Sequence, residues 1–124
     1  MKDFFRYEFN ADLNILNKYY YGPICLEDIF TSWEYAFNNN IVSDDIKGFV
    51  LSFEEANYNF NALRFTEIIS FYDKHLDVFK GKKVALITVN PADTVIPFLF
   101  KTKAKGYLSE PFSTKSAAID WIIG

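Results

Sequence analysis

The residues best suited to catalysis or binding lie together in one short segment, from Glu54 to Asn61. Glu54 and Glu55 are adjacent carboxylates, and a pair of carboxylates can act as a general acid and a general base. Such neighbours are also common on solvated loops, and the segment offers no nucleophile or metal-binding pattern beside them. The composition of this segment therefore favours binding over catalysis, and we expect the protein not to be an enzyme.

The same segment carries amides and aromatic rings, which suit the recognition of a partner or ligand. It follows a predicted buried strand, and open α/β sheets usually bind ligands at the carboxyl ends of their strands. A second segment, residues 90–94, follows the next buried strand and has the asparagine and proline of a helix start. The candidate partner- or ligand-binding residues are therefore Glu54, Glu55, Asn57, Tyr58, Asn59, Phe60, Asn61, Asn90, Asp93 and Thr94.

Both segments also have a simpler interpretation. The asparagines of the first segment could merely turn the chain and cap a helix in a solvated loop. The second segment could be an ordinary helix cap. Free N–H groups at a helix start can hold an anion, but Asp93 would compete for the same field. The sequence leaves these alternatives open.

Several classes of site are excluded by the rarity of the residues they need. The chain has 1 Cys and 1 His, so it holds neither an internal disulfide nor a multi-cysteine or His-rich metal site. Its 5 Gly residues are isolated and form no phosphate-binding loop. We expect no metal and no cofactor.

Length and charge narrow the class of protein further. The chain has 124 residues and a formal net charge of -3, which predicts one domain over residues 1–124 and argues against nucleic-acid binding. The N-terminus has no apolar leader, and no apolar run approaches the ~20 residues of a transmembrane segment. We therefore expect a cytoplasmic protein.

Aromatic side chains make up 19% of the chain, with 14 Phe and 8 Tyr residues. Most of these rings should form the core. A groove lined by the remainder could instead bind a lipid-like, apolar small ligand in a pocket of a few hundred Å³. Exposed aromatic rings could also support a homodimer.

Hydrophobic periodicity predicts alternating strands and helices after an initial hairpin. The clearest helix covers residues 26–38, where Leu26, Ile29, Phe30, Trp33 and Phe37 form one stripe. Strands are predicted at 4–9, 13–21, 46–53, 84–89 and 107–112. The other helices are predicted at 62–79 and from a Ser113 cap to 123. A helix that ends at Gly106 either begins after Asn90 and kinks at Pro97 or begins later, near Asp93.

The order of these elements, and the ending from Ser113 to Ile122 with Ala118 and Trp121, resemble the SpoIIAA-like or STAS-type domain. That resemblance implies an α/β fold, with a mixed five-stranded sheet, an antiparallel first strand and four helices. Members include bacterial anti-sigma-factor antagonists and cytoplasmic domains of anion transporters. The resemblance therefore implies a regulatory module with a protein partner.

One departure from the family pattern concerns its control by phosphorylation. The phosphoacceptor serine or threonine of the antagonists lies at the start of the second helix, and Asn61 falls near that position here. An asparagine has no hydroxyl to phosphorylate, so the charge switch of a phosphate is absent at this position. We expect Asn61 to act as a helix N-cap instead.

Overall fold

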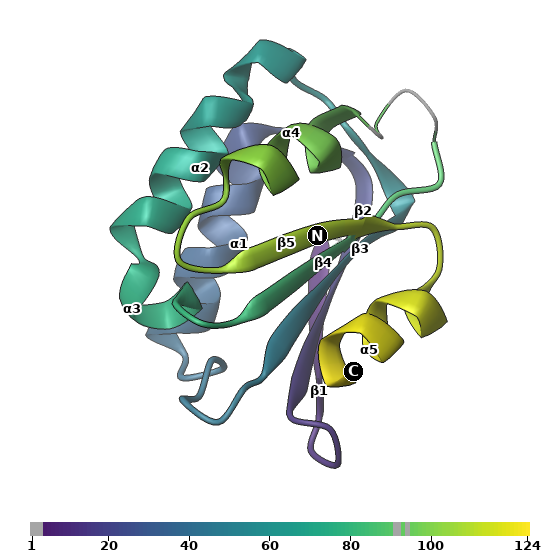
Figure 1. Ribbon diagram of the computed structural model, residues 1–124. Helices are drawn as coiled ribbons and strands as arrows, with labels where there is room; N and C mark the ends of the chain where they lie inside the picture. Colours follow the sequence, from purple (N-terminus) through teal and green to yellow (C-terminus); the bar gives the residue numbers. More distant parts are fainter. Residues whose placement is uncertain (1–3, 91–92, 94) are drawn as a thin grey trace.

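The computed structural model describes residues 4–90, 93 and 95–124. Its centre is one five-stranded sheet in the order β1-β2-β3-β4-β5 (Figure 1). β1 pairs with β2 in the antiparallel sense, and the three remaining pairs are parallel. The strands are β1 (Phe5–Asn10), β2 (Ile15–Ile24), β3 (Gly48–Tyr58), β4 (Lys83–Ile87) and β5 (Leu108–Phe112). The predicted mixed sheet with an antiparallel first strand is confirmed.

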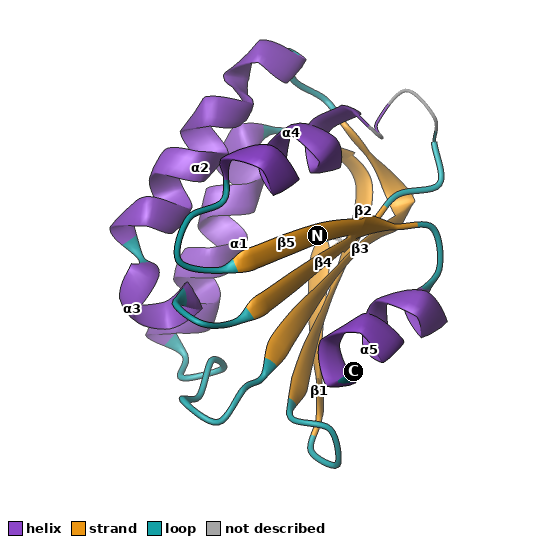
Figure 2. Cartoon of the chain, in the orientation of Figure 1, coloured by secondary structure: helices purple, strands orange, loops and turns teal. Residues whose placement is uncertain are grey.

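Helices cover both faces of this sheet, as Figure 2 shows. One face lies under α1 (Leu26–Asn38), α2 (Phe65–Lys74), the short α3 (Leu76–Phe79) and α4 (Val95–Lys103). The other face lies under α5 (Lys115–Ile123). Four helices are long, as predicted, and α3 and a short 3-10 helix η1 (Ala62–Arg64) accompany them. Among the described residues, no helix has both the length and the apolar character to cross a membrane.

The two central strands are longer than their sequences indicated. We predicted that the second strand would end at residue 21, but β2 continues through Gly22 and Pro23 to Ile24 because it pairs with β3 through that stretch. The pairing of β3 with β4 ends at Ser52 and Ile87, whereas its pairing with β2 continues to Tyr58. The ends of β2 and β3 therefore form a two-stranded ribbon that extends beyond the other strands.

The predicted helix over 62–79 is interrupted. It begins as η1, becomes α2, and breaks at His75 before α3. His75 occupies the C-cap of α2 and the N-cap of α3, and its carbonyl accepts bonds from both Val78 and Phe79. Sequence periodicity alone could not reveal this break, because the apolar spacing continues through it.

The larger part of the core lies between the sheet and α1, α2 and α4. Trp33 is fully buried at its centre, where its ring lies 5.1 Å from that of Phe79 and 5.4 Å from that of Phe49. The smaller part, beneath α5, contains Val50 and Ile122. Most of the aromatic content serves this packing, as the composition predicted.

A lysine is buried inside the larger core. Strand alternation turns Lys18 of β2 toward α1, and its side chain has no solvent exposure. Its Nζ lies 3.6 Å from the centroid of the Trp33 ring. Burial lowers the pKa of this amine well below its ordinary value.

Candidate functional site

Most of the first candidate segment is a strand rather than the loop that we predicted. Glu54, Glu55 and Asn57 are exposed residues within β3, and only Asn59 to Asn61 lie beyond the strand. The extension of β2 explains the difference, because Tyr21 pairs with Glu55 and Ile24 with Tyr58. The candidate residues from Glu54 to Tyr58 thus lie on a strand whose side chains alternate between two faces.

The structure brings the two candidate segments together through Asp93. The Tyr58 N–H lies 3.4 Å from Asp93 Oδ2 and donates to it, which joins the end of β3 to the segment before α4. Asp93 is only 7% exposed, and burial raises the pKa of its carboxyl group. Its own N–H donates to the Asn90 carbonyl at 2.9 Å. Thr94, the last candidate of this segment, lies outside the described residues.

Asn61 performs the capping role that its type predicted. Its side-chain oxygen accepts a 2.9 Å hydrogen bond from the Leu63 N–H, at the start of η1. Glu54 also has a local partner, since Ser52 Oγ donates to its carboxylate at 3.1 Å. These contacts fix the two ends of the first candidate segment.

Exposed apolar residues also lie around this edge, and none of them is among the candidate binding residues. Leu63 of η1 is 80% exposed, and Phe98 of α4 is 53% exposed. Val89, which follows β4, and Val95, which begins α4, are also exposed. All four lie on segments that follow β3 and β4 at the carboxyl edge of the sheet.

The interior beside this edge is nearly filled. An apolar cavity of about 20 Å³ lies among Tyr20, Phe53 and Tyr58 on the sheet side and Tyr72 and Phe100 on the helix side. The Tyr58 hydroxyl is buried without a hydrogen-bond partner among the described residues. This volume is far below the few hundred Å³ that we predicted for an apolar ligand.

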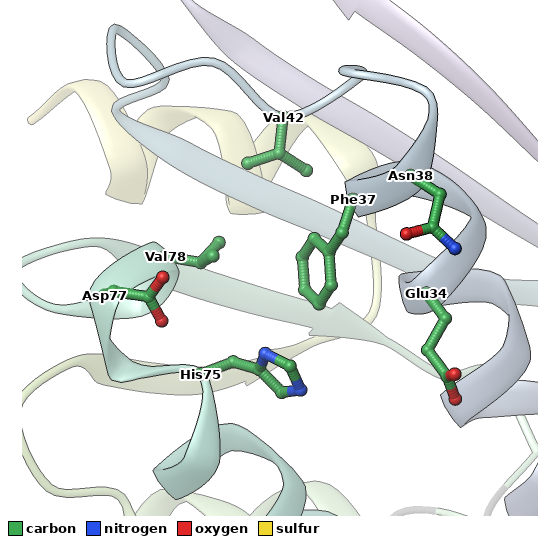
Figure 3. Close-up of a pocket in the computed structure, with 7 residues that line it drawn as sticks. All are labelled: Glu34, Phe37, Asn38, Val42, His75, Asp77 and Val78. Atoms are coloured by element: carbon green, nitrogen blue, oxygen red, sulfur yellow. The ribbon is translucent and has the colours of Figure 1, made fainter.

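A wider hollow opens at the other end of the helical layer. Figure 3 shows the His75 ring and the Asp77 carboxylate on one side of Phe37, with Glu34 and Asn38 on the other. The hollow measures about 440 Å³, and the His75 ring lies 4.9 Å from that of Phe37. None of its residues was a candidate. Within the described part of the chain, no group of three or more His, Cys, Asp and Glu side chains could hold a metal ion.

Solved structures with the same architecture place this geometry among known folds. An uncharacterized protein of the DUF3478 family with a SpoIIAA-like fold, from Shewanella loihica PV-4, is 18% identical, with a TM-score of 0.63. That match covers 95% of this chain and 91% of the other. The chain has a SpoIIAA-like fold.

The anti-sigma factor antagonist SpoIIAA, in its unphosphorylated form, shares the SpoIIAA-like fold at 13% identity and a TM-score of 0.55. This second match covers 97% of the chain and 98% of SpoIIAA. A scan of family models finds no match, and neither does a search of the curated proteins. The resemblance drawn from the order of elements is thus confirmed for the SpoIIAA-like fold.

Proposed function

We propose that this protein is a non-catalytic regulatory module that binds another protein through the carboxyl edge of its sheet. The binding surface comprises the exposed end of β3, η1 and the residues that follow β4. The observation that carries the proposal is the exposure of Leu63 and Phe98 on η1 and α4, the elements that follow β3 and β4. A large apolar side chain that is mostly exposed loses hydrophobic stabilisation, which a partner can restore by covering it.

The polar residues of this surface suit a supporting role. Glu54, Glu55 and Asn57 are exposed and lie on a strand that pairs with β2 on both sides of one register irregularity between Tyr19 and Tyr21. Such a backbone holds its side chains in place before a partner arrives, which reduces the entropy cost of association. Polar residues around an apolar centre are typical of protein interfaces.

The SpoIIAA-like fold supports the same class of function, since one protein that shares it is an anti-sigma factor antagonist. The family resemblance implies that Asn61 falls near the phosphoacceptor position of the antagonists, and its side chain caps η1. We propose that its partner recognises the surface without a phosphate at this position.

The test compares two double variants, each of which replaces two apolar side chains that are more than half exposed. Leu63→Ser with Phe98→Ser removes the apolar centre of the proposed surface. Leu108→Ser with Ile123→Ser removes apolar side chains of 59% and 51% exposure on β5 and α5. Both should keep the wild-type circular dichroism spectrum. We expect the first double variant, but not the second, to fail to capture from a host extract a protein that the wild type captures. Equal capture by both double variants would contradict the proposal.

A further inference from the structure

Lys18 lies in an aromatic cage formed by three elements. Its Nζ is 3.6 Å from the ring centroid of Trp33 on α1, 4.9 Å from that of Tyr20 on β2, and 5.5 Å from that of Tyr7 on β1. Among the described residues, no hydrogen-bond acceptor reaches this nitrogen. An ammonium ion in such a place would lose its hydration and regain only the attraction of the rings.

Within the described part of the chain, no negative charge counters the effect of burial on the Lys18 amine. The ionisable side chains at the cage are Tyr7 from β1 and Tyr20 from β2, with Tyr72 of α2 across the Trp33 ring. The charge of Asp28 on α1 helps to raise the pKa of Tyr20. The cause that lowers the pKa of Lys18 is burial. The closed structure therefore favours a neutral amine.

Of the three elements around the amine, β1 is the easiest to displace. It is a six-residue edge strand that pairs with β2, and none of its residues is fully buried. Its side chains meet the helical layer through the Tyr7 hydroxyl, which donates to the Ser32 carbonyl at 2.6 Å, and through ring contacts such as that of Phe5 with Tyr35 at 5.4 Å. Tyr7 also stands opposite Lys18 in the β1–β2 register. Displacing β1 would therefore remove one wall of the cage.

We propose that Lys18 makes the attachment of β1 depend on protons, so that the strand detaches more readily as the pH falls. In the open state the amine reaches water and takes up one proton. In the closed state it stays neutral beneath Tyr7. An open β1 also exposes the edge of β2, whose backbone groups could then pair with another strand.

The proton linkage has a definite signature. A solvated lysine has a pKa of about 10.4, so the open state is charged throughout neutral pH. While the closed state remains neutral, the equilibrium constant for opening rises tenfold for each unit by which the pH falls. The effect disappears above a pH of about 10.4, where both states are neutral.

Hydrogen exchange of the β1 and β2 backbone amides measures this constant, after division by the intrinsic exchange rate at each pH. Between pH 9 and pH 7 we expect protection of the β1–β2 pairs to fall, with about a hundredfold as the upper limit set by one proton. The backbone amide of Val50 in β3 should remain more protected than those of β1, because its exchange requires a larger opening of the sheet. Equal protection of β1 and Val50 at every pH would overturn the proposal.

Two variants separate the proton effect from a simple loss of packing. Lys18→Met keeps a long apolar side chain without a titrating group, and its protection should not change with pH. Tyr7→Phe removes the bond to Ser32, so opening should rise by a constant factor while the tenfold slope remains. A flat wild-type profile, or a slope that persists in Lys18→Met, would refute the role of Lys18.

Discussion

Replacing Gly48 by alanine tests how closely the sheet and α5 approach each other. Gly48 is the buried first residue of β3. A Cβ atom at this position would lie 2.7 Å from Cγ2 of Ile122 and 2.9 Å from the Lys83 carbonyl oxygen. The first contact can be relieved by a small movement of α5. The second involves the backbone of the neighbouring strand, which cannot move without disturbing the sheet.

Two opposing effects determine the size of the change. Overpacking a well-filled core costs about 1–3 kcal/mol. Alanine also lowers the conformational entropy of the unfolded chain, which stabilises the folded state by about 0.4–1 kcal/mol. We therefore expect Gly48→Ala to lower the free energy of unfolding by about 1–2 kcal/mol. For a chain of this size, that corresponds to a fall in Tm of about 4–8 °C.

Urea unfolding followed by tryptophan fluorescence measures this loss, since Trp33 is fully buried. Ile122→Ala provides the second arm of a double-mutant cycle. In that background Gly48→Ala should cost less, but the Lys83 carbonyl should keep part of the penalty. A wild-type or higher stability of Gly48→Ala would refute the argument from close approach.

Two further predictions concern pH and helix capping. Burial raises the pKa of five tyrosines, so their contribution to the free energy of unfolding is complete below the unfolded pKa of about 10. Above that pH the contribution is lost by about 1.4 kcal/mol per tyrosine and pH unit. Urea unfolding at pH 10 and 11 should detect this loss, and unchanged stability would contradict it. Thr114 Oγ1 accepts from the Ala117 N–H at 3.2 Å, so Thr114→Ala should cost about 1 kcal/mol in thermal unfolding, whereas Ser113→Ala should change little. The tyrosines are Tyr7, Tyr20, Tyr58, Tyr72 and Tyr107.

The elements that the sequence predicted best are those with a continuous pattern and clear ends. The helix predicted over 26–38 has those bounds in the structure, because its apolar stripe begins after Cys25 and ends before consecutive asparagines. The last helix was predicted correctly, but its cap is Thr114 rather than Ser113. Adjacent hydroxyl residues are chemically equivalent as caps, so only the path of the chain decides between them.

Long-range pairing accounts for what the sequence could not predict. Residues 54–58 are polar and have the composition of a loop, yet β2 holds them in a strand. Lys18 would ordinarily be assigned to the exposed face of β2, since charged residues are rarely buried. Its cage is assembled from β1, β2 and α1, so no local pattern reveals it. The contact between Tyr58 and Asp93 is similarly non-local.

The ribbon at the ends of β2 and β3 also bears on how the protein can change over evolution. A register irregularity between Tyr19 and Tyr21 already separates this ribbon from the regular pairing below it. Inserting or deleting one residue beyond that point would exchange the two side-chain faces of the altered strand. The strands beneath α1 and α5 would keep their register. Changes in chain length could thus alter which residues meet a partner while the core retains its packing.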